Sequence, residues 1–175
     1  IPTDRRNLVW KAASLLHRVS TGKTSAPQGL AIDLRKRIPS EAGLGGGSAD
    51  AAMTLLALNK LWQLDLDLAT LTRIGARLGA DVPYFLVGGT ALGLGRGDDI
   101  YPLADLPTVH VVILRPGFGV SSADAYTWFD EESRRLREPD PRPCPAGWPA
   151  WAATLRNELE APVVRHHPAI ARIRQ

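Results

Sequence analysis

A run of glycines leads directly into an alanine-rich apolar stretch between positions 39 and 52, and this junction constrains the chain more than any other segment. Four glycines fall within positions 43–47, where they can adopt positive φ and let the backbone approach a ligand closely. We expect residues 48–50 to open a helix, whose first N–H groups lack intrahelical partners and whose dipole favours an anion. The junction predicts a phosphate-binding turn; the alternative is a tight loop without a ligand.

The residues around the glycines exclude two common phosphate-binding motifs. A P-loop needs Lys and then Ser or Thr after its last glycine, whereas Gly47 is followed by Ser48 and Ala49. The segment 22–24 (Gly-Lys-Thr) would need a glycine at position 17, which is His17. A dinucleotide fingerprint would need a third glycine at position 48.

Residues 38–52 closely resemble the ATP loop of the GHMP small-molecule kinases. The triple glycine followed by Ser-Ala-Asp is similar to the form in the diphosphocytidyl-methylerythritol branch, whereas mevalonate and homoserine kinases usually show Gly-Leu-Gly-Ser-Ser-Ala. Glu41 stands where the family often has a small residue, and Ala49 replaces a frequent second Ser. The resemblance implies a loop that binds the ATP phosphates through Pro39, Ser40, Glu41, Ala42, Gly43, Leu44, Gly45, Gly46, Gly47, Ser48 and Ala49.

Three further segments resemble the same family in the same order, at 7–13, 79–85 and 157–163. The second, Gly-Ala-Asp-Val-Pro-Tyr-Phe, is similar to the element that carries the family's catalytic Asp, here Asp81. In the third, Glu158 replaces an Asp. The resemblance therefore spans nearly the whole chain.

Asp81 can also be interpreted from its neighbours. It follows a predicted helix end at Gly79, and Pro83 should hold Val82 in an extended conformation. We expect a poorly solvated carboxylate there, able to accept a proton from a substrate hydroxyl. The residues alone favour Asp81 as a cap of the following turn, because Asp is common there; the resemblance favours a catalytic base.

The resemblance implies an α+β fold in two lobes. Residues 1–104 would form a ribosomal-protein-S5-like ATP-binding domain without its first strands, and residues 105–175 would begin an incomplete, ferredoxin-like substrate-binding domain. The family's catalytic Lys and its last glycine-rich motif have no counterpart here, so we expect an internal fragment of a longer protein.

Apolar periodicity places the elements. We expect a helix after a Thr3-Asp4 cap, the loop helix to about Trp62, and a helix capped by Asp67 that ends at Gly79. Further predicted elements are a partly alternating strand at 30–34, a hairpin within 88–103, a buried strand at 110–114, a helix at 122–137 and a proline-rich connector at 139–149.

Composition excludes several classes of protein. No apolar run approaches a membrane span and no signal peptide is evident, which predicts a cytoplasmic enzyme. Cys144 is the only cysteine, so neither a disulfide framework nor a cysteine metal site is expected. The net charge is +3 without a basic stripe interleaved with aromatics, which argues against nucleic acid. Cations at 35–37 either attract ATP or end a solvated strand.

Two polar pairs invite a metal interpretation that we do not favour. Asp98 and Asp99 lie in a predicted hairpin turn, where adjacent acids are usually solvated. His166 and His167 have no third ligand nearby and are expected to be surface or packing residues. No metal-ligating residue is therefore predicted.

The resemblance implies ATP-dependent phosphorylation of the 2-hydroxyl of 4-diphosphocytidyl-2-C-methyl-D-erythritol, with Mg²⁺ neutralising the triphosphate. The nearest alternative is another GHMP kinase acting on mevalonate or homoserine. A nucleotide-binding module without catalysis is a second alternative, and a structural domain of the ribosomal-protein type is a third.

Overall fold

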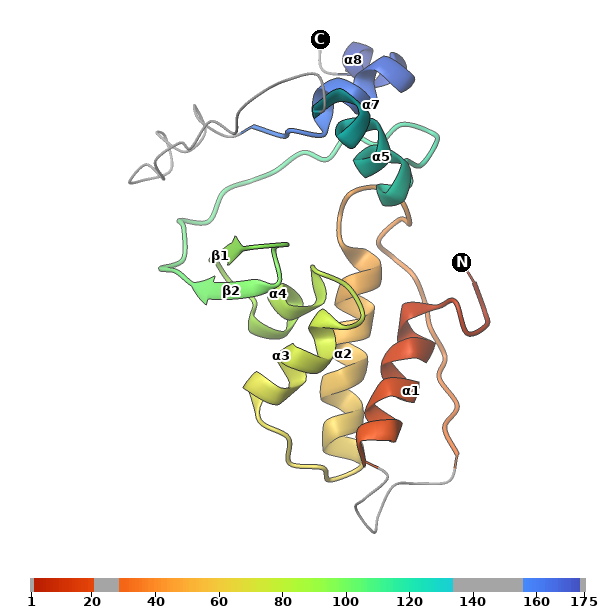
Figure 1. Ribbon diagram of the computed structural model, residues 1–175, viewed down its shortest axis with the longest axis vertical. Coiled ribbons are helices and arrows are strands. Elements are labelled where there is room, and N and C mark those ends of the chain that lie inside the picture. The colour runs from red at the N-terminus through yellow and green to blue at the C-terminus, as the bar shows by residue number, and fades with distance from the viewer. Residues whose placement is uncertain (1, 21–28, 134–155, 174–175) are drawn as a thin grey trace. The chain divides into compact units, whose positions relative to one another are not determined.

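The computed structural model describes residues 2–20, 29–133 and 156–173, in two compact units. The first unit holds residues 1–40 and 44–105, and the second holds residues 41–43 and 106–175. The elements (Figure 1) are α1 (Leu8–Ser20), α2 (Gly46–Leu61), α3 (Leu68–Ala76), α4 (Val82–Val87), β1 (Ala91–Leu94), β2 (Asp99–Pro102), α5 (Ser122–Ser133), α7 (Glu160–His166) and α8 (Ala169–Ile173). Helices with a small sheet confirm the predicted α+β class.

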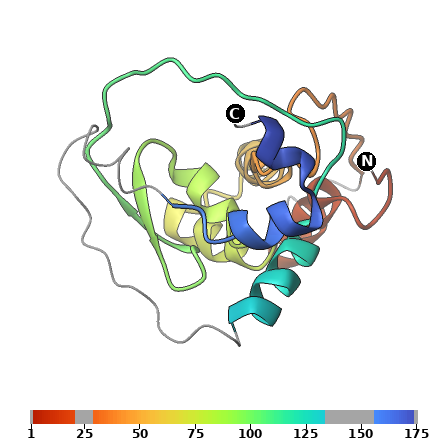
Figure 2. The same cartoon turned by 90° about the horizontal axis from the view of Figure 1, so that it is seen from above.

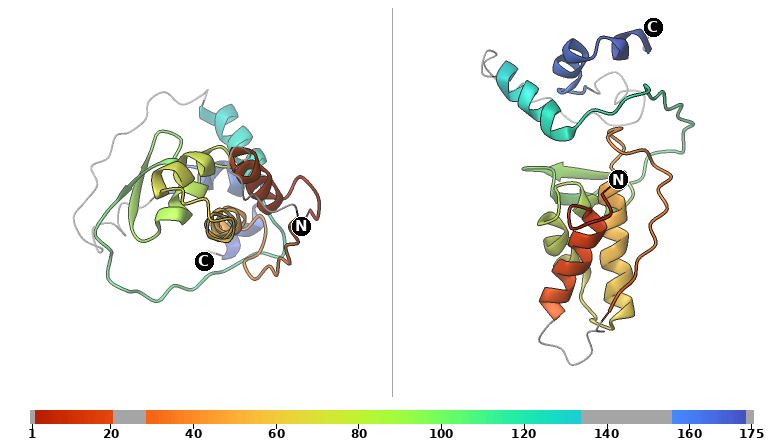
Figure 3. Two further views of the ribbon diagram at one scale, coloured as in Figure 1. Left: turned by 90° about the horizontal axis from the view of Figure 1, so that it is seen from below. Right: turned by 90° about the vertical axis from the view of Figure 1, so that its right-hand side faces the viewer.

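In the first unit, α2 packs against α1 and against the α3–α4 pair, and α1 also contacts α3 (Figures 2 and 3). Two consecutive alanines of α2, Ala51 and Ala52, are fully buried and let the neighbouring helices approach its backbone. Leu55, one turn further on, is also fully buried. The core comprises Ala12, Leu16, Ala51, Ala52, Leu55, Leu58, Trp62, Leu64, Leu71, Ile74, Val82 and Leu86.

The helix caps were predicted with mixed success. Asp67 caps α3 as predicted, because its Oδ1 accepts the Thr70 N–H at 2.8 Å. The predicted Thr3-Asp4 cap of α1 is wrong, because Asn7 Oδ1 accepts the Val9 N–H at 2.9 Å. The carboxylate of Asp4 is occupied instead by the Arg6 backbone N–H and guanidinium.

The predicted hairpin is confirmed. β1 and β2 are antiparallel, with Ala91 opposite Pro102 and Leu94 opposite Asp99. Gly95 and Gly97 have φ of 63° and 87°, a conformation that favours glycine and lets the chain reverse between the strands.

The other two predicted strands are wrong. Residues 30–34 and 110–114 form neither helix nor ladder in the described part of the chain. Val112, predicted to be buried, is 84% exposed, and Leu30 is 41% exposed. An apolar run becomes a buried strand only when a neighbouring strand takes up its N–H and C=O groups, and the described residues supply no such neighbour.

In the second unit, α5 packs against α7. The indole of Trp128 stacks on the His166 ring with centroids 4.0 Å apart, and Arg165 pairs with Glu132. Ala125 is buried as predicted. The described part of α5 ends at Ser133, so the predicted extension to residue 137 lies outside the described residues, as do the connector at 139–149 and its Cys144.

Candidate functional site

The glycine-rich junction forms a helix start, and α2 begins at Gly46, two residues earlier than predicted. Gly45 precedes it in the left-handed conformation, with φ 64° and ψ 11°, and its carbonyl accepts the Ala49 N–H at 2.9 Å. The N–H groups of Gly46, Gly47 and Ser48 therefore lie before the first intrahelical donor, and Gly45 has no side chain to cap them. No acidic residue lies in the first turn. The helix start can accept an anion.

Two of the glycines have no room for a side chain. A Cβ on Gly45 would lie 2.6 Å from the Phe85 ring, and a Cβ on Gly46 would lie 2.7 Å from Ile38 Cγ2. Gly46 is buried, and Lys36 Nζ would lie 3.3 Å from the same Cβ. Close packing around the helix start therefore explains these glycines, in addition to any approach of a ligand.

The earlier part of the loop, residues 41–43, groups with the second unit. Glu41 has a positive φ of 55°, and its carbonyl accepts the Val120 N–H at 2.9 Å. Its side chain lies against Gly119, whose Cβ would be 2.7 Å from Glu41 Cβ. Gly43 has φ 69° and nothing within 4 Å of its Cβ position. Glu41 stands where a small residue is usual, and these contacts help to hold residues 41–43 within this unit.

Asp81 directly precedes α4, and its surroundings differ from the prediction. Val82 is helical instead of extended, because Pro83 occupies the first turn of α4, where its missing N–H costs nothing. Asp81 is exposed, so a poorly solvated carboxylate is wrong. The capping interpretation is also wrong, because the Asp81 side chain makes no capping hydrogen bond. Within the described chain this carboxylate has no hydrogen bond or ion pair and can accept a proton.

Phe85 connects the helix of Asp81 to the loop. It lies four residues after Asp81 on α4, and its ring covers Gly45. The ring also contacts the core and makes an edge contact with Tyr84, with centroids 5.2 Å apart. Sequence reasoning missed this contact; a proline followed by apolar residues could have indicated the helix start and so the one-turn spacing.

Lys36 is a second residue at the helix start that the sequence did not single out from its neighbours. Its Nζ donates to the Gly46 carbonyl at 3.0 Å and pairs with the Asp50 carboxylate. The two side chains are only 13% and 27% exposed. The Arg35 side chain, by contrast, is 90% exposed, and its Nε lies 3.7 Å from Asp33 Oδ2. The solvated strand end does not describe Lys36, which binds protein groups at the start of α2. Attraction of ATP by the 35–37 cations stays a prediction.

The polar pairs at 98–99 and 166–167 have protein partners. The hydrogen bond from Arg96 holds the pKa of the Asp98 carboxyl below its ordinary value, and Asp99 accepts from the Tyr101 hydroxyl at 3.0 Å. The His167 ring stacks on Phe118 with centroids 4.9 Å apart. Among the described residues no group of three His, Cys, Asp or Glu side chains could hold a metal ion, and no helix there is long and apolar enough to cross a membrane.

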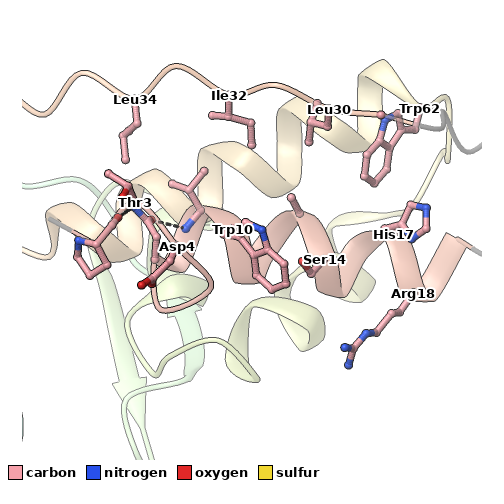
Figure 4. A pocket seen from close by; sticks show the side chains of 15 residues that line it. Thr3, Asp4, Trp10, Ser14, His17, Arg18, Leu30, Ile32, Leu34 and Trp62 are labelled. Carbon is pink, nitrogen blue, oxygen red and sulfur yellow. Dashed lines mark hydrogen bonds between the residues drawn. The ribbon is translucent and has the colours of Figure 1, made fainter.

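One groove of the first unit lies away from these residues. A groove of about 810 Å³ runs between α1 and the extended segment 29–34 (Figure 4). Trp10 and His17 of α1 face Leu30 and Ile32 across it, and Trp62 closes one end. The groove includes neither Asp81 nor any residue of the 39–49 loop.

Comparison with known proteins gives the sequences and the fold that this chain resembles. Residues 7–89 match the model of the GHMP kinases N terminal domain. The chain is 39% identical over 178 residues to the 4-diphosphocytidyl-2-C-methyl-D-erythritol kinase of Shouchella clausii (strain KSM-K16), covering 100% of this chain and 59% of the relative. It is 40% identical over 191 residues to the enzyme of the same name from Synechococcus sp. (strain JA-3-3Ab), again covering 100% and 59%.

A crystal structure of 4-(cytidine 5'-diphospho)-2C-methyl-D-erythritol kinase superposes with a TM-score of 0.75 at 39% identity, covering 99% of this chain and 62% of that one. The chain therefore has the fold of this kinase, and residues 7–89 are similar to the N-terminal domain of the GHMP kinases. It resembles the diphosphocytidyl-methylerythritol kinases along its whole length, and it spans 59% of the length of the two relatives described.

Proposed function

We propose that the full-length protein transfers the γ-phosphoryl group of ATP to the 2-hydroxyl of 4-diphosphocytidyl-2-C-methyl-D-erythritol. The observation that carries this proposal is the open start of α2 joined through Phe85 to the helix of Asp81. The names of the similar proteins support the choice of alcohol. Residues 1–104 would be the ATP-binding domain and residues 105–175 the beginning of the substrate-binding domain.

In this proposal the loop from Pro39 to Ala49 holds the ATP phosphates. The N–H groups at the start of α2 supply donors, and the helix dipole adds attraction for negative charge. Such a site needs no reorganisation when charge develops on the transferred group, since its dipoles are fixed by the packing of Gly45 and Gly46.

Asp81 would accept the proton of the acceptor hydroxyl. Its carboxylate is exposed and free of hydrogen bonds within the described chain, so an incoming hydroxyl need not displace a protein partner. Phe85 keeps α4 against the loop and thereby limits where Asp81 can lie relative to the start of α2. Positioning of this kind does much of the work in phosphoryl transfer.

Mg²⁺ would neutralise the triphosphate. In nucleotide sites this ion is held largely by phosphates and waters, with one or two protein oxygens. The first turn of α2 offers one side-chain oxygen, the hydroxyl of Ser48, which is half-buried. Ser48 therefore fits as a single ligand that leaves most positions to phosphate and water.

An ADP-release assay on the full-length protein tests the proposal. We expect turnover with 4-diphosphocytidyl-2-C-methyl-D-erythritol and none above background with mevalonate or homoserine. Preference for mevalonate or homoserine would assign the protein to another GHMP branch. ATP binding without ADP release from any of the three would instead identify a nucleotide-binding module.

A further inference from the structure

We propose that Lys36 is a positioning residue that keeps the anion site open by neutralising Asp50, and that it does not bind the phosphates itself. This inference rests on the proposed ATP site and deepens it. Lys36 comes from the extended segment before the loop, and Asp50 lies in the second turn of α2.

The negative charge of Asp50 lies close to the start of α2 and would repel a bound triphosphate if no cation neutralised it. Asp50 lies four residues after Gly46, so its Cα is about 6 Å along the axis from the beginning of the helix, and its side chain is tilted toward that end. An unpaired carboxylate at that distance opposes a bound triphosphate, and the effect is strong because the Asp50 side chain is only 27% exposed and poorly screened. The first turn itself carries no acid. Asp50 is therefore the nearest negative side chain on α2.

The contacts of Lys36 show what its ammonium does. It is 13% exposed, and its donors are directed at Asp50 and at the Gly46 carbonyl, 3.0 Å away. A cation beside the positive end of a helix dipole would be unfavourable without these two acceptors. Ile38, two residues on, packs over Gly46 and fixes the approach of this segment. Because Asp50 balances the charge of Lys36, the anion is attracted by the backbone N–H groups at the start of α2 and not by the ammonium.

Four proteins separate neutralisation from direct contact: wild type, Lys36→Met, Asp50→Asn and the double variant. Calorimetric titration of the full-length protein with ATP, and separately with inorganic triphosphate, gives the affinities. Lys36→Met should weaken binding about tenfold or more by exposing the Asp50 charge. The double variant should return to within about threefold of wild type, and Asp50→Asn alone should bind at least as tightly as wild type.

The recovery distinguishes this role from a structural one, because the ion pair is absent from both Lys36→Met and the double variant. Lys60→Met, at the other end of α2 and exposed, removes the same charge and should change affinity less than twofold. A double variant as weak as Lys36→Met, or weakened binding by Asp50→Asn, overturns the inference. If Lys36→Met does not fold, the ATP affinity of Asp50→Asn decides: affinity equal to or above that of wild type supports the inference, and weaker binding overturns it. Wild-type protein that binds neither ATP nor triphosphate refutes the proposed site.

Discussion

The helical core of the first unit and the apolar run at 111–114 in the second unit differ in how far their apolar side chains are buried. In the first unit α2 packs against three other helices, and Leu55 at its centre is fully buried. In the second unit the run at 111–114 is 63–84% exposed, although all four of its residues are apolar. The difference shows that an apolar sequence indicates which side chains are suited to burial, but does not indicate which element will pack over them. The helices find their partners within one unit, whereas the extended run has none among the described residues.

The largest effect is expected at an exposed residue of the well-packed unit. Asp81→Asn should lower turnover about 100-fold or more with little change in ATP affinity, since only the proton acceptor is lost. The thermal midpoint should not change, because Asp81 makes no hydrogen bond in the described chain. Turnover and midpoint are measured on one preparation, with Asp65→Asn as the exposed control. Near-normal turnover would remove the proposed base.

This contrast predicts that truncation of an apolar side chain to Ala lowers the free energy of unfolding more in α2 than in the 111–114 run. Leu55→Ala should lower the free energy of unfolding by about 2–5 kcal/mol, because a buried side chain is lost and a cavity remains. Val112→Ala should change it by no more than about 0.5 kcal/mol, because that side chain is 84% exposed. Urea unfolding of the full-length variants measures both. Equal losses would mean that the 111–114 run is covered in the full-length protein, and the comparison would not hold there.

The smallest effect is expected at the cap of α3. The hydrogen bonds from the Thr70 side chain and backbone hold the pKa of the Asp67 carboxyl below its ordinary value of 3.8. The charged carboxylate therefore stabilises the fold above pH 3.8, and this stabilisation is lost as the pH falls through the lowered pKa. Asp67→Ala should lower the thermal midpoint slightly at pH 7 and less as the solution is acidified below pH 3.8. A midpoint difference independent of pH would show that the charge of Asp67 contributes nothing.

Much of the first unit could be predicted because its signals are local. Asp67 lies next to the helix that it caps, and the hairpin is marked by glycines between alternating residues. The start of α2 follows from glycines beside an apolar run, although two of these glycines became part of the helix. Each of these features can be predicted without knowledge of the tertiary structure, because the interacting groups lie within a few residues of each other.

The rest of the candidate site depends on tertiary contacts that no short window contains. Lys36 and Asp50 are 14 residues apart, and Phe85 reaches Gly45 from a different helix. A substitution at Gly45 cannot test phosphate approach by itself, because any Cβ at position 45 meets the Phe85 ring at 2.6 Å on a backbone with φ 64°. The roles of the loop and of Asp81 remain predictions.

The contact between Gly45 and Phe85 also limits how this site can change during evolution. Since the ring occupies the space that a side chain at 45 would need, the two positions cannot drift independently. A side chain at 45 would require the Phe85 ring to shift away from the loop, or a smaller residue at 85. Glycine at 45 and the ring at 85, on the helix that begins next to Asp81, thus form one packing unit.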